Sequence, residues 1–391
     1  MMIFKRLTGF LLLFLLGSAV LNAQQAETIQ IDFQPEVVIR KLPSILNETS
    51  GLLRFQNYFL SHNDSGGTPE IFLIDTLSGK ITGTTRVSNA SNRDWEDIAS
   101  DSVYLYIGDF GNNIGNRKDL CIYRIPLRDL ATQGMTECAA EKIEFSWPDQ
   151  IDFEAANQKN NFDCEAMLVH NGQLFLFTKR WKDRTSAIYS LPDSPGKYIA
   201  RFIIRFNADG LITGADISPN QQNVVLCGYK NYTPYILLFN ASALDSGYLQ
   251  SILRVDFSEI FAAQTEGVCF DNQGTIWISA ENTPLHKAGI YRIKPALLPM
   301  KQNPFRRFFY EWKRESHEIS IKSRYNGQRK YHIEILDRRG KIYDKIKIGS
   351  KDVTVENTFR IVPKGEIIVR MYSGKDEITL RIPKENKSVN E

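Results

Sequence analysis

Three glutamates, Glu96, Glu165 and Glu266, each begin a short recurring motif of a small or acidic residue, then Gly, Ala or Asp, then an apolar residue. If the fold arranges the repeats around one axis, the three carboxylates meet at one opening. Clustered carboxylates repel unless a cation, a proton or a basic side chain intervenes. The pattern predicts a site for a hard cation such as calcium, with these glutamates as metal ligands. An acid/base role on a substrate and capping of a neighbouring backbone are the alternatives.

Other charged residues are expected at the same opening, because they end or begin predicted strands on the same side. Lys179 and Arg180 would supply positive charge to the glutamates. The predicted ligand-binding residues are Asp64, Glu96, Asp97, Asp109, Glu165, Lys179, Arg180, Glu266 and Glu281. No complete catalytic motif such as GxSxG, HExxH or a P-loop is present, so the catalytic residues stay unknown and the sequence leaves open whether the protein is an enzyme.

The motif recurs five times, beginning at Ser50, Glu96, Glu165, Gly214 and Glu266, with spacings of 46, 69, 49 and 52 residues. A second motif follows each occurrence at a similar offset, as in Ile122-Tyr123-Arg124-Ile125 and Ile290-Tyr291-Arg292-Ile293. A β-prone run lies between the two motifs, and turn residues separate the runs. Each unit therefore predicts three strands, and the first four units have room for a fourth.

Four-stranded units of this length are typical of a β-propeller. The sequence predicts five blades, with six as the alternative count and a β-sandwich as the competing all-β fold. The last unit lacks a fourth strand, and a strand at residues 37–42 is expected to supply it and close the ring. The region 129–161 is interpreted as an inserted loop. We assign residues 28–299 to the propeller.

The N-terminus has the order of a secretory signal peptide. Lys5 and Arg6 precede an apolar run at residues 11–16, and small residues follow up to residue 23. Residues 1–23 are therefore expected to be removed on export to the periplasm, the cell surface or the medium. No later run is long and apolar enough for a transmembrane anchor.

Residues 300–391 predict a small β-sandwich with alternating strands. This segment carries 22 Lys and Arg against 13 Asp and Glu, whereas residues 1–299 carry 26 against 32. An acidic propeller disfavours nucleic acid as its partner. Five scattered cysteines show no metal-ligand spacing, and Cys121 with Cys138 is the pair to test for a disulfide.

Two resemblances extend this interpretation. Residues 335–341 (ILDRRGK) and 363–365 (PKG) are similar to the sorting domain of type IX secretion, which would make that machinery a partner. The segments at 50–52 (SGL), 63–67 (NDSGG) and 94–99 (DWEDIA) resemble a family of secreted bacterial propellers, distantly similar to SdiA-regulated and esterase-like phytase propellers. Some of those relatives bind calcium and some are hydrolases.

The sequence thus favours an exported propeller that acts as a ligand-binding or scaffold module through an acidic channel mouth, with calcium as a candidate cofactor. Its ligand is expected outside the cell or at the cell surface. The alternative is a metal-dependent hydrolase of phosphate or carboxylic esters that uses the three glutamates.

Overall fold

A computed structural model of the chain describes residues 23–24 and 26–293, followed by the strand segments 307–313, 318–324, 331–337, 339–348, 354–360, 367–373 and 376–382. Residues 1–22 of the predicted signal peptide lie outside the described residues, so export stays a prediction. Within the described part, no helix is long and apolar enough to cross a membrane.

Antiparallel four-stranded sheets make up most of the chain from residue 36 to residue 293. The first is β3 (Thr49–Phe55), β4 (Tyr58–Asn63), β5 (Glu70–Asp75) and β6 (Ile81–Val87). The second is β7 (Trp95–Ser100), β8 (Tyr104–Asp109), β9 (Cys121–Pro126) and β11 (Glu141–Ser146). The third is β12 (Asp163–His170), β13 (Gln173–Lys179), β14 (Ser186–Pro192) and β16 (Arg201–Phe206). The fourth is β17 (Leu211–Ile217), β18 (Asn223–Lys230), β19 (Thr233–Asn240) and β20 (Ser251–Asp256). The fifth is β21 (Thr265–Phe270), β22 (Ile276–Ala280), β23 (Gly289–Ile293) and β2 (Glu36–Ile39).

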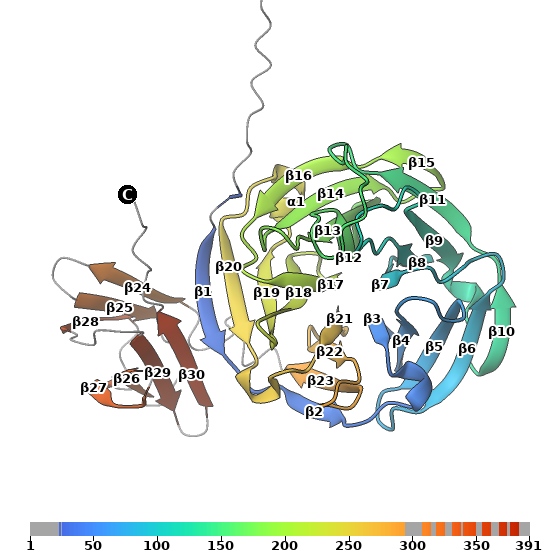
Figure 1. Ribbon diagram of the computed structural model, residues 1–391. Helices are drawn as coiled ribbons and strands as arrows, with labels where there is room; N and C mark the ends of the chain where they lie inside the picture. The colour runs from blue at the N-terminus through green and yellow to red at the C-terminus, as the bar shows by residue number, and fades with distance from the viewer. Residues whose placement is uncertain are drawn as a thin grey trace, which may run out of the picture.

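These five sheets of the described chain stand in a ring (Figure 1). The innermost strands β3, β7, β12, β17 and β21 each contact the next, and β21 contacts β3. The fold is therefore a β-propeller, as the repeats predict. The strand expected at 37–42 is present as β2, which pairs antiparallel with β23 and so joins the N-terminal segment to the last sheet.

Apolar layers between neighbouring sheets hold the ring together. Strands such as β13 are buried on both faces, because each sheet packs against one sheet on either side. One such layer contains Phe59 of the first sheet and Trp277 of the fifth, whose ring centroids lie 5.1 Å apart. Burying apolar surface at every junction favours the closed ring over a row of separate sheets.

Three of the sheets gain a further strand on the outer edge, and each added strand runs parallel to its neighbour. β10 (Gly134–Cys138) pairs with β6, β15 (Gly196–Ile199) with β11, and β1 (Glu27–Asp32) with β20. The expectation of a loop over 129–161 is therefore wrong in part, because this region contains β10 in addition to β11, which is the fourth strand expected in this unit. β10 covers the open edge of the first sheet, which would otherwise expose unpaired backbone groups.

The C-terminal strands form two groups. β24 (Arg307–Lys313), β25 (Glu318–Arg324) and β28 (Thr354–Arg360) make one sheet. β26 (Tyr331–Asp337), β27 (Ile342–Ile348), β29 (Ile367–Ser373) and β30 (Asp376–Ile382) continue the fourth propeller sheet, because β30 pairs with β1. The strands expected between 332 and 382 are present, whereas β24 and β25 were not predicted. The sorting role of this segment stays a prediction.

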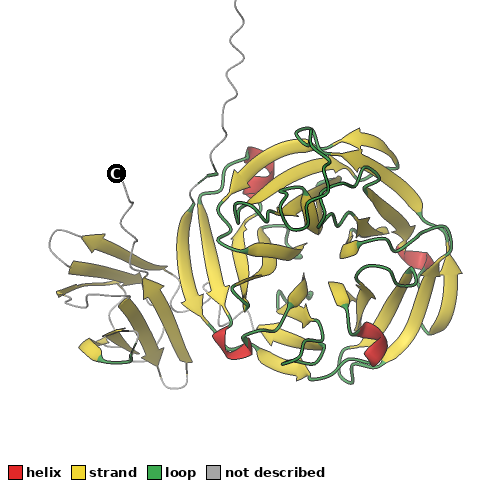
Figure 2. Ribbon diagram, in the orientation of Figure 1, coloured by secondary structure: helices red, strands yellow, loops and turns green. Residues whose placement is uncertain are grey.

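Helical structure in the described part is limited to α1 (Ser242–Ser246) and three single turns, η1 (Ser44–Leu46), η2 (Leu127–Asp129) and η3 (Ser258–Ile260), as Figure 2 shows. All five cysteines are free and buried, so the structure contains no bridge between Cys121 and Cys138.

Candidate functional site

A β-bulge re-aims one residue near the start of each innermost strand. The strand pairing skips Glu96, Glu165, Thr213 and Glu266, and it skips Ser50 and Gly51 in β3. A bulged residue is left out of the ladder and turns its side chain in a new direction. The three glutamates therefore occupy equivalent positions, as predicted. In the fourth sheet the equivalent residue is Thr213 and not Gly214, the residue that the sequence motif placed there.

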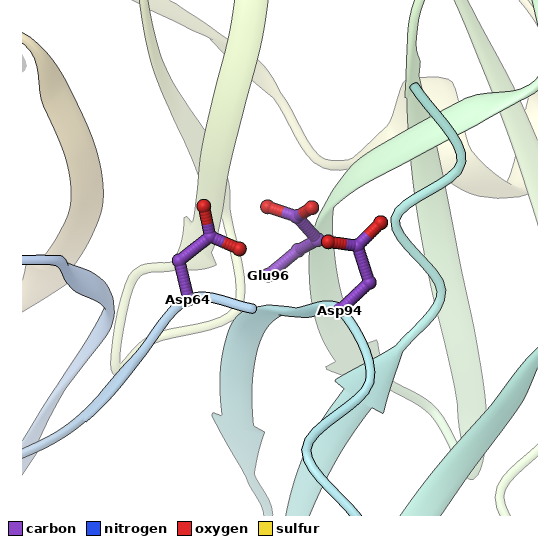
Figure 3. Close-up of side chains that lie close together, drawn as sticks. All are labelled: Asp64, Asp94 and Glu96. Atoms are coloured by element: carbon purple, nitrogen blue, oxygen red, sulfur yellow. The ribbon is translucent and has the colours of Figure 1, made fainter. Parts of the chain in front are cut away.

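Asp64, Asp94 and Glu96 form the tightest group of carboxylates among the described residues. Each offers an oxygen atom, and these atoms lie within 4.8 Å of one another. Asp64 follows β4, Asp94 precedes β7 and Glu96 lies in its bulge, so two neighbouring sheets supply the group (Figure 3). We call these three residues the carboxylate triad.

Among the described residues no basic side chain forms an ion pair with the triad, because the nearby Arg117 and Lys179 pair with Asp109 and Glu165. Glu96 is 4% exposed, and its carboxylate accepts no hydrogen bond from the described residues. Burial raises the pKa of Glu96 well above its usual value, and the charges of Glu165, Asp64 and Asp94 raise it further. Burial together with Asp64 raises the pKa of Asp94 to about 7. Such a group is costly unless a proton or a cation neutralises it.

Asn92 and Asp109 position the triad. The Asn92 side chain donates to the carbonyls of Asn63 (3.0 Å) and Asp64 (2.6 Å), and it accepts from the Trp95 N–H (3.2 Å). Asp109 accepts a hydrogen bond from the Asp94 N–H (3.3 Å). These bonds fix the two connections that carry the aspartates.

Gly111 leaves the space that the triad occupies. A β-carbon at this position would lie 2.1 Å from Glu96 Oε1 and 2.5 Å from Asp94 Oδ2. Both oxygens end flexible side chains, so an added methyl group would push the carboxylates apart while the fold persists. We expect Gly111→Ala to weaken cation binding about tenfold, measured by isothermal titration calorimetry. Gly67→Ala is the control, because its β-carbon would meet only Asn92 Nδ2, at 3.8 Å. Equal affinities of the two variants would contradict this role of Gly111.

Glu165 is already neutralised. Lys179 Nζ lies 2.9 Å from Glu165 Oε2, which confirms the predicted pairing. The ammonium also lies over the rings of Trp181 (5.0 Å) and Tyr229 (5.6 Å). Burial alone would lower the pKa of Lys179, but the carboxylate of Glu165 beside it holds that pKa well above its usual value. The lysine therefore stays charged and makes Glu165 a poor free ligand.

Glu266 and Glu281 lie on the side of the fifth sheet. Gln264 Nε2 donates to Glu266 Oε1 at 2.9 Å. Burial raises the pKa of Glu266 to about 7, although Lys179 acts in the opposite direction. Burial and the charge of Glu266 raise the pKa of Glu281 to about 9.

Asp163 and six of the carboxylates described above interact electrostatically with one another. We call this set the acidic opening: Asp64, Asp94, Glu96, Asp163, Glu165, Glu266 and Glu281, with Lys179 as the ammonium among them. Asp94 and Asp163 were absent from the sequence-based set. Their position in the sequence, one or two residues before a predicted strand or motif, was the signal that could have identified them.

Three predicted ligand-binding residues have other partners in the structure. Asp97 is fully buried and accepts hydrogen bonds from the backbone N–H groups of Met167 (2.7 Å) and Ala215 (3.1 Å), in two other sheets. Asp109 pairs with Arg117 at 2.8 Å, and Arg180 pairs with Asp183 at 2.7 Å. In the structure these three side chains are therefore engaged with other protein groups.

Among the described residues, the three predicted metal ligands do not form one compact group. Glu96 belongs to a compact group of carboxylates, but its partners are Asp64 and Asp94, whereas Glu165 and Glu266 are bonded to Lys179 and Gln264. In the described chain, aspartates fill the alternative role of capping a neighbouring backbone. They include Asp97, Asp163, which accepts from the Asn112 N–H at 2.6 Å, and Asp216, which accepts from the Phe270 N–H at 2.7 Å.

Comparison with known proteins adds solved structures of low similarity. No protein-family model matches the chain, and no curated protein matches it. The calcium-binding protein regucalcin of Agrobacterium tumefaciens is 10% identical, with 68% of this chain and 95% of that chain covered and a TM-score of 0.36. The periplasmic gluconolactonase PpgL of Pseudomonas aeruginosa is 9% identical (86% and 97% covered, TM-score 0.34), and the Dos1 propeller is 11% identical (91% and 92%, 0.31). At these TM-scores the similarities carry no argument about the site.

Proposed function

We propose that this protein is a ligand-binding β-propeller that holds a calcium ion in the carboxylate triad. The observation that supports the proposal is the approach of Asp64, Asp94 and Glu96, with no ion pair to a basic side chain in the part of the chain that the structure describes. Two oxygens bound to one calcium ion at about 2.3–2.6 Å can lie no more than about 5 Å apart, a condition that the triad meets. A bound cation would also offset the cost of burying Glu96 as a charged group.

The location of the triad carboxylates in and beside connections between strands favours calcium over magnesium. The triad joins the β4–β5 connection to the start of β7, and such loop carboxylates adapt to the irregular, larger shell of calcium. Magnesium requires a tighter octahedral shell and gives up its water less readily. Water molecules or the molecule that the propeller binds would complete the coordination shell of the ion. The ion would then link the protein to that molecule.

Calorimetric titration of metal-free protein with calcium tests this function. We expect one calcium per chain, and we expect Glu96→Gln to weaken binding by about tenfold or more, since it removes one charged ligand. Glu154→Gln is the matched control, because Glu154 is an exposed carboxylate in the connection before β12. Absence of binding to the wild type, or equal binding by Glu96→Gln, would contradict the proposal.

The hydrolytic alternative makes a different prediction at the same residue. If the calcium-loaded wild type cleaves p-nitrophenyl phosphate or p-nitrophenyl acetate and Glu96→Gln does not, catalysis replaces simple binding as the function. Calcium binding without turnover favours the binding module.

A further inference from the structure

Three large apolar side chains are exposed on the face of the ring that carries the acidic opening. Tyr232, Phe261 and Leu285 are 72%, 51% and 72% exposed. They come from the β18–β19, β20–β21 and β22–β23 connections, which alternate strand direction places on the same face as the triad. We call them the apolar ledge. A group of exposed apolar side chains with a polar rim marks an interaction site on a protein surface.

Hydrogen bonds lock the three connections of the ledge together. The Ala262 N–H donates to the Tyr232 carbonyl at 2.7 Å, and Thr283 Oγ1 donates to the Ala262 carbonyl at 3.3 Å. His286 Nε2 lies 2.8 Å from the Phe261 carbonyl. The rings of Tyr232 and Phe261 meet edge to face, with centroids 6.4 Å apart. The ledge is therefore preorganised, so little conformational entropy would be lost when a partner binds it.

The same segment connects the ledge to the carboxylates. Gln264 follows the ledge residue Phe261 closely in sequence and donates to Glu266 Oε1, while its carbonyl accepts the Glu281 N–H at 2.9 Å. The ledge thus adjoins the Glu266 and Glu281 side of the opening. The opening holds seven carboxyl groups against one ammonium among the described residues, an excess that favours a cationic group over an anionic one.

We propose that the ligand of this face is a basic peptide segment, in which an apolar side chain packs on the ledge and a neighbouring Lys or Arg enters the Glu266 and Glu281 side. Charge complementarity selects a cationic partner over a neutral or acidic one. Aromatic rings next to carboxylates also favour ammonium and guanidinium groups. The inference rests on the acidic opening being the binding site, but it does not require calcium.

Fluorescence anisotropy of a labelled peptide of alternating lysine and phenylalanine, titrated with the full chain, tests the inference. We expect binding that weakens at high salt, and we expect Phe261→Ala, Tyr232→Ala and Glu281→Gln each to weaken it about fivefold or more. Tyr248→Ala is the matched control, because Tyr248 is 63% exposed in the β19–β20 connection on the opposite face.

Two comparison ligands make the test decisive. Equal binding of a glutamate–phenylalanine peptide, or binding of maltohexaose in place of the basic peptide, would overturn the proposal, and so would unchanged binding by Phe261→Ala. Calcium titration of Phe261→Ala should match the wild type, because the ledge is separate from the triad. Loss of peptide binding in that variant with calcium binding intact separates this inference from the calcium proposal.

Discussion

Replacing Asp97 with alanine is expected to lower the free energy of unfolding by roughly 4 kcal/mol or more. One buried carboxylate here accepts three backbone hydrogen bonds, from Met167 and Ala215 in two other sheets and from its own neighbour Ile98 (2.8 Å). Each buried N–H group that loses its acceptor costs about 1–3 kcal/mol, and the variant leaves three such groups without acceptors. Denaturant unfolding followed by circular dichroism measures the loss.

Two further variants show whether the bonds themselves cause this loss. Asp216→Ala should cost less, because Asp216 accepts from only two described backbone donors, Ile217 and Phe270 (2.7 Å each). Asp97→Asn keeps one carbonyl oxygen at nearly the same size and should give an intermediate loss. If Asp97→Ala lowers the free energy of unfolding by no more than Asp216→Ala does, the hydrogen bonds of Asp97 do not hold the sheets together as the geometry indicates.

The second large effect concerns pH. The pKa of Glu281 is raised to about 9, mainly by burial and then by the charge of Glu266. A carboxyl whose pKa is higher in the folded than in the unfolded protein stabilises the fold below its usual pKa and loses that contribution as pH rises. In metal-free protein we therefore expect stability to fall from about pH 4.5 to pH 9 through this group.

Thermal unfolding of wild type and Glu281→Gln across this range measures the effect. The glutamine cannot ionise, so the variant should melt at about the same temperature as the wild type near pH 5 and roughly 5 °C or more above it near pH 9. Glu154→Gln, which changes an exposed carboxylate, should follow the wild type throughout. A constant difference between wild type and Glu281→Gln at all pH values would contradict ionisation of Glu281 as the cause.

The repeated strands of the propeller could be predicted because each one combines an apolar run with turn residues at its ends. The closing strand β2 was predicted for the same reason, together with the missing fourth strand of the last unit. The outer strands β10 and β15 were not predicted. They lie at sheet edges, are largely exposed and pair in parallel, so neither alternation nor a tight turn marks them in the sequence.

The position of the candidate site could be predicted from the sequence, but not all of the residues that form it. Repeat position brought Glu96 to the opening, and charge suggested that Lys179 would pair with a glutamate there. Residue type could not distinguish a carboxylate that faces a ligand from Asp97, which accepts backbone N–H groups. Asp94 was missed because it precedes the motif, and only the β-bulge at Glu96 brings the two side chains together.

The strands that join the two ends of the ring also set a constraint on how the chain is made. Glu36 of β2 bonds to Arg292 of β23, 256 residues later, although β2 leaves the ribosome among the first strands. Contacts so distant in sequence form slowly, because a long loop must close before they contribute. A nascent chain therefore carries an open row of sheets with uncovered apolar faces until β23 emerges, and this interval is when a holding chaperone would protect it from aggregation.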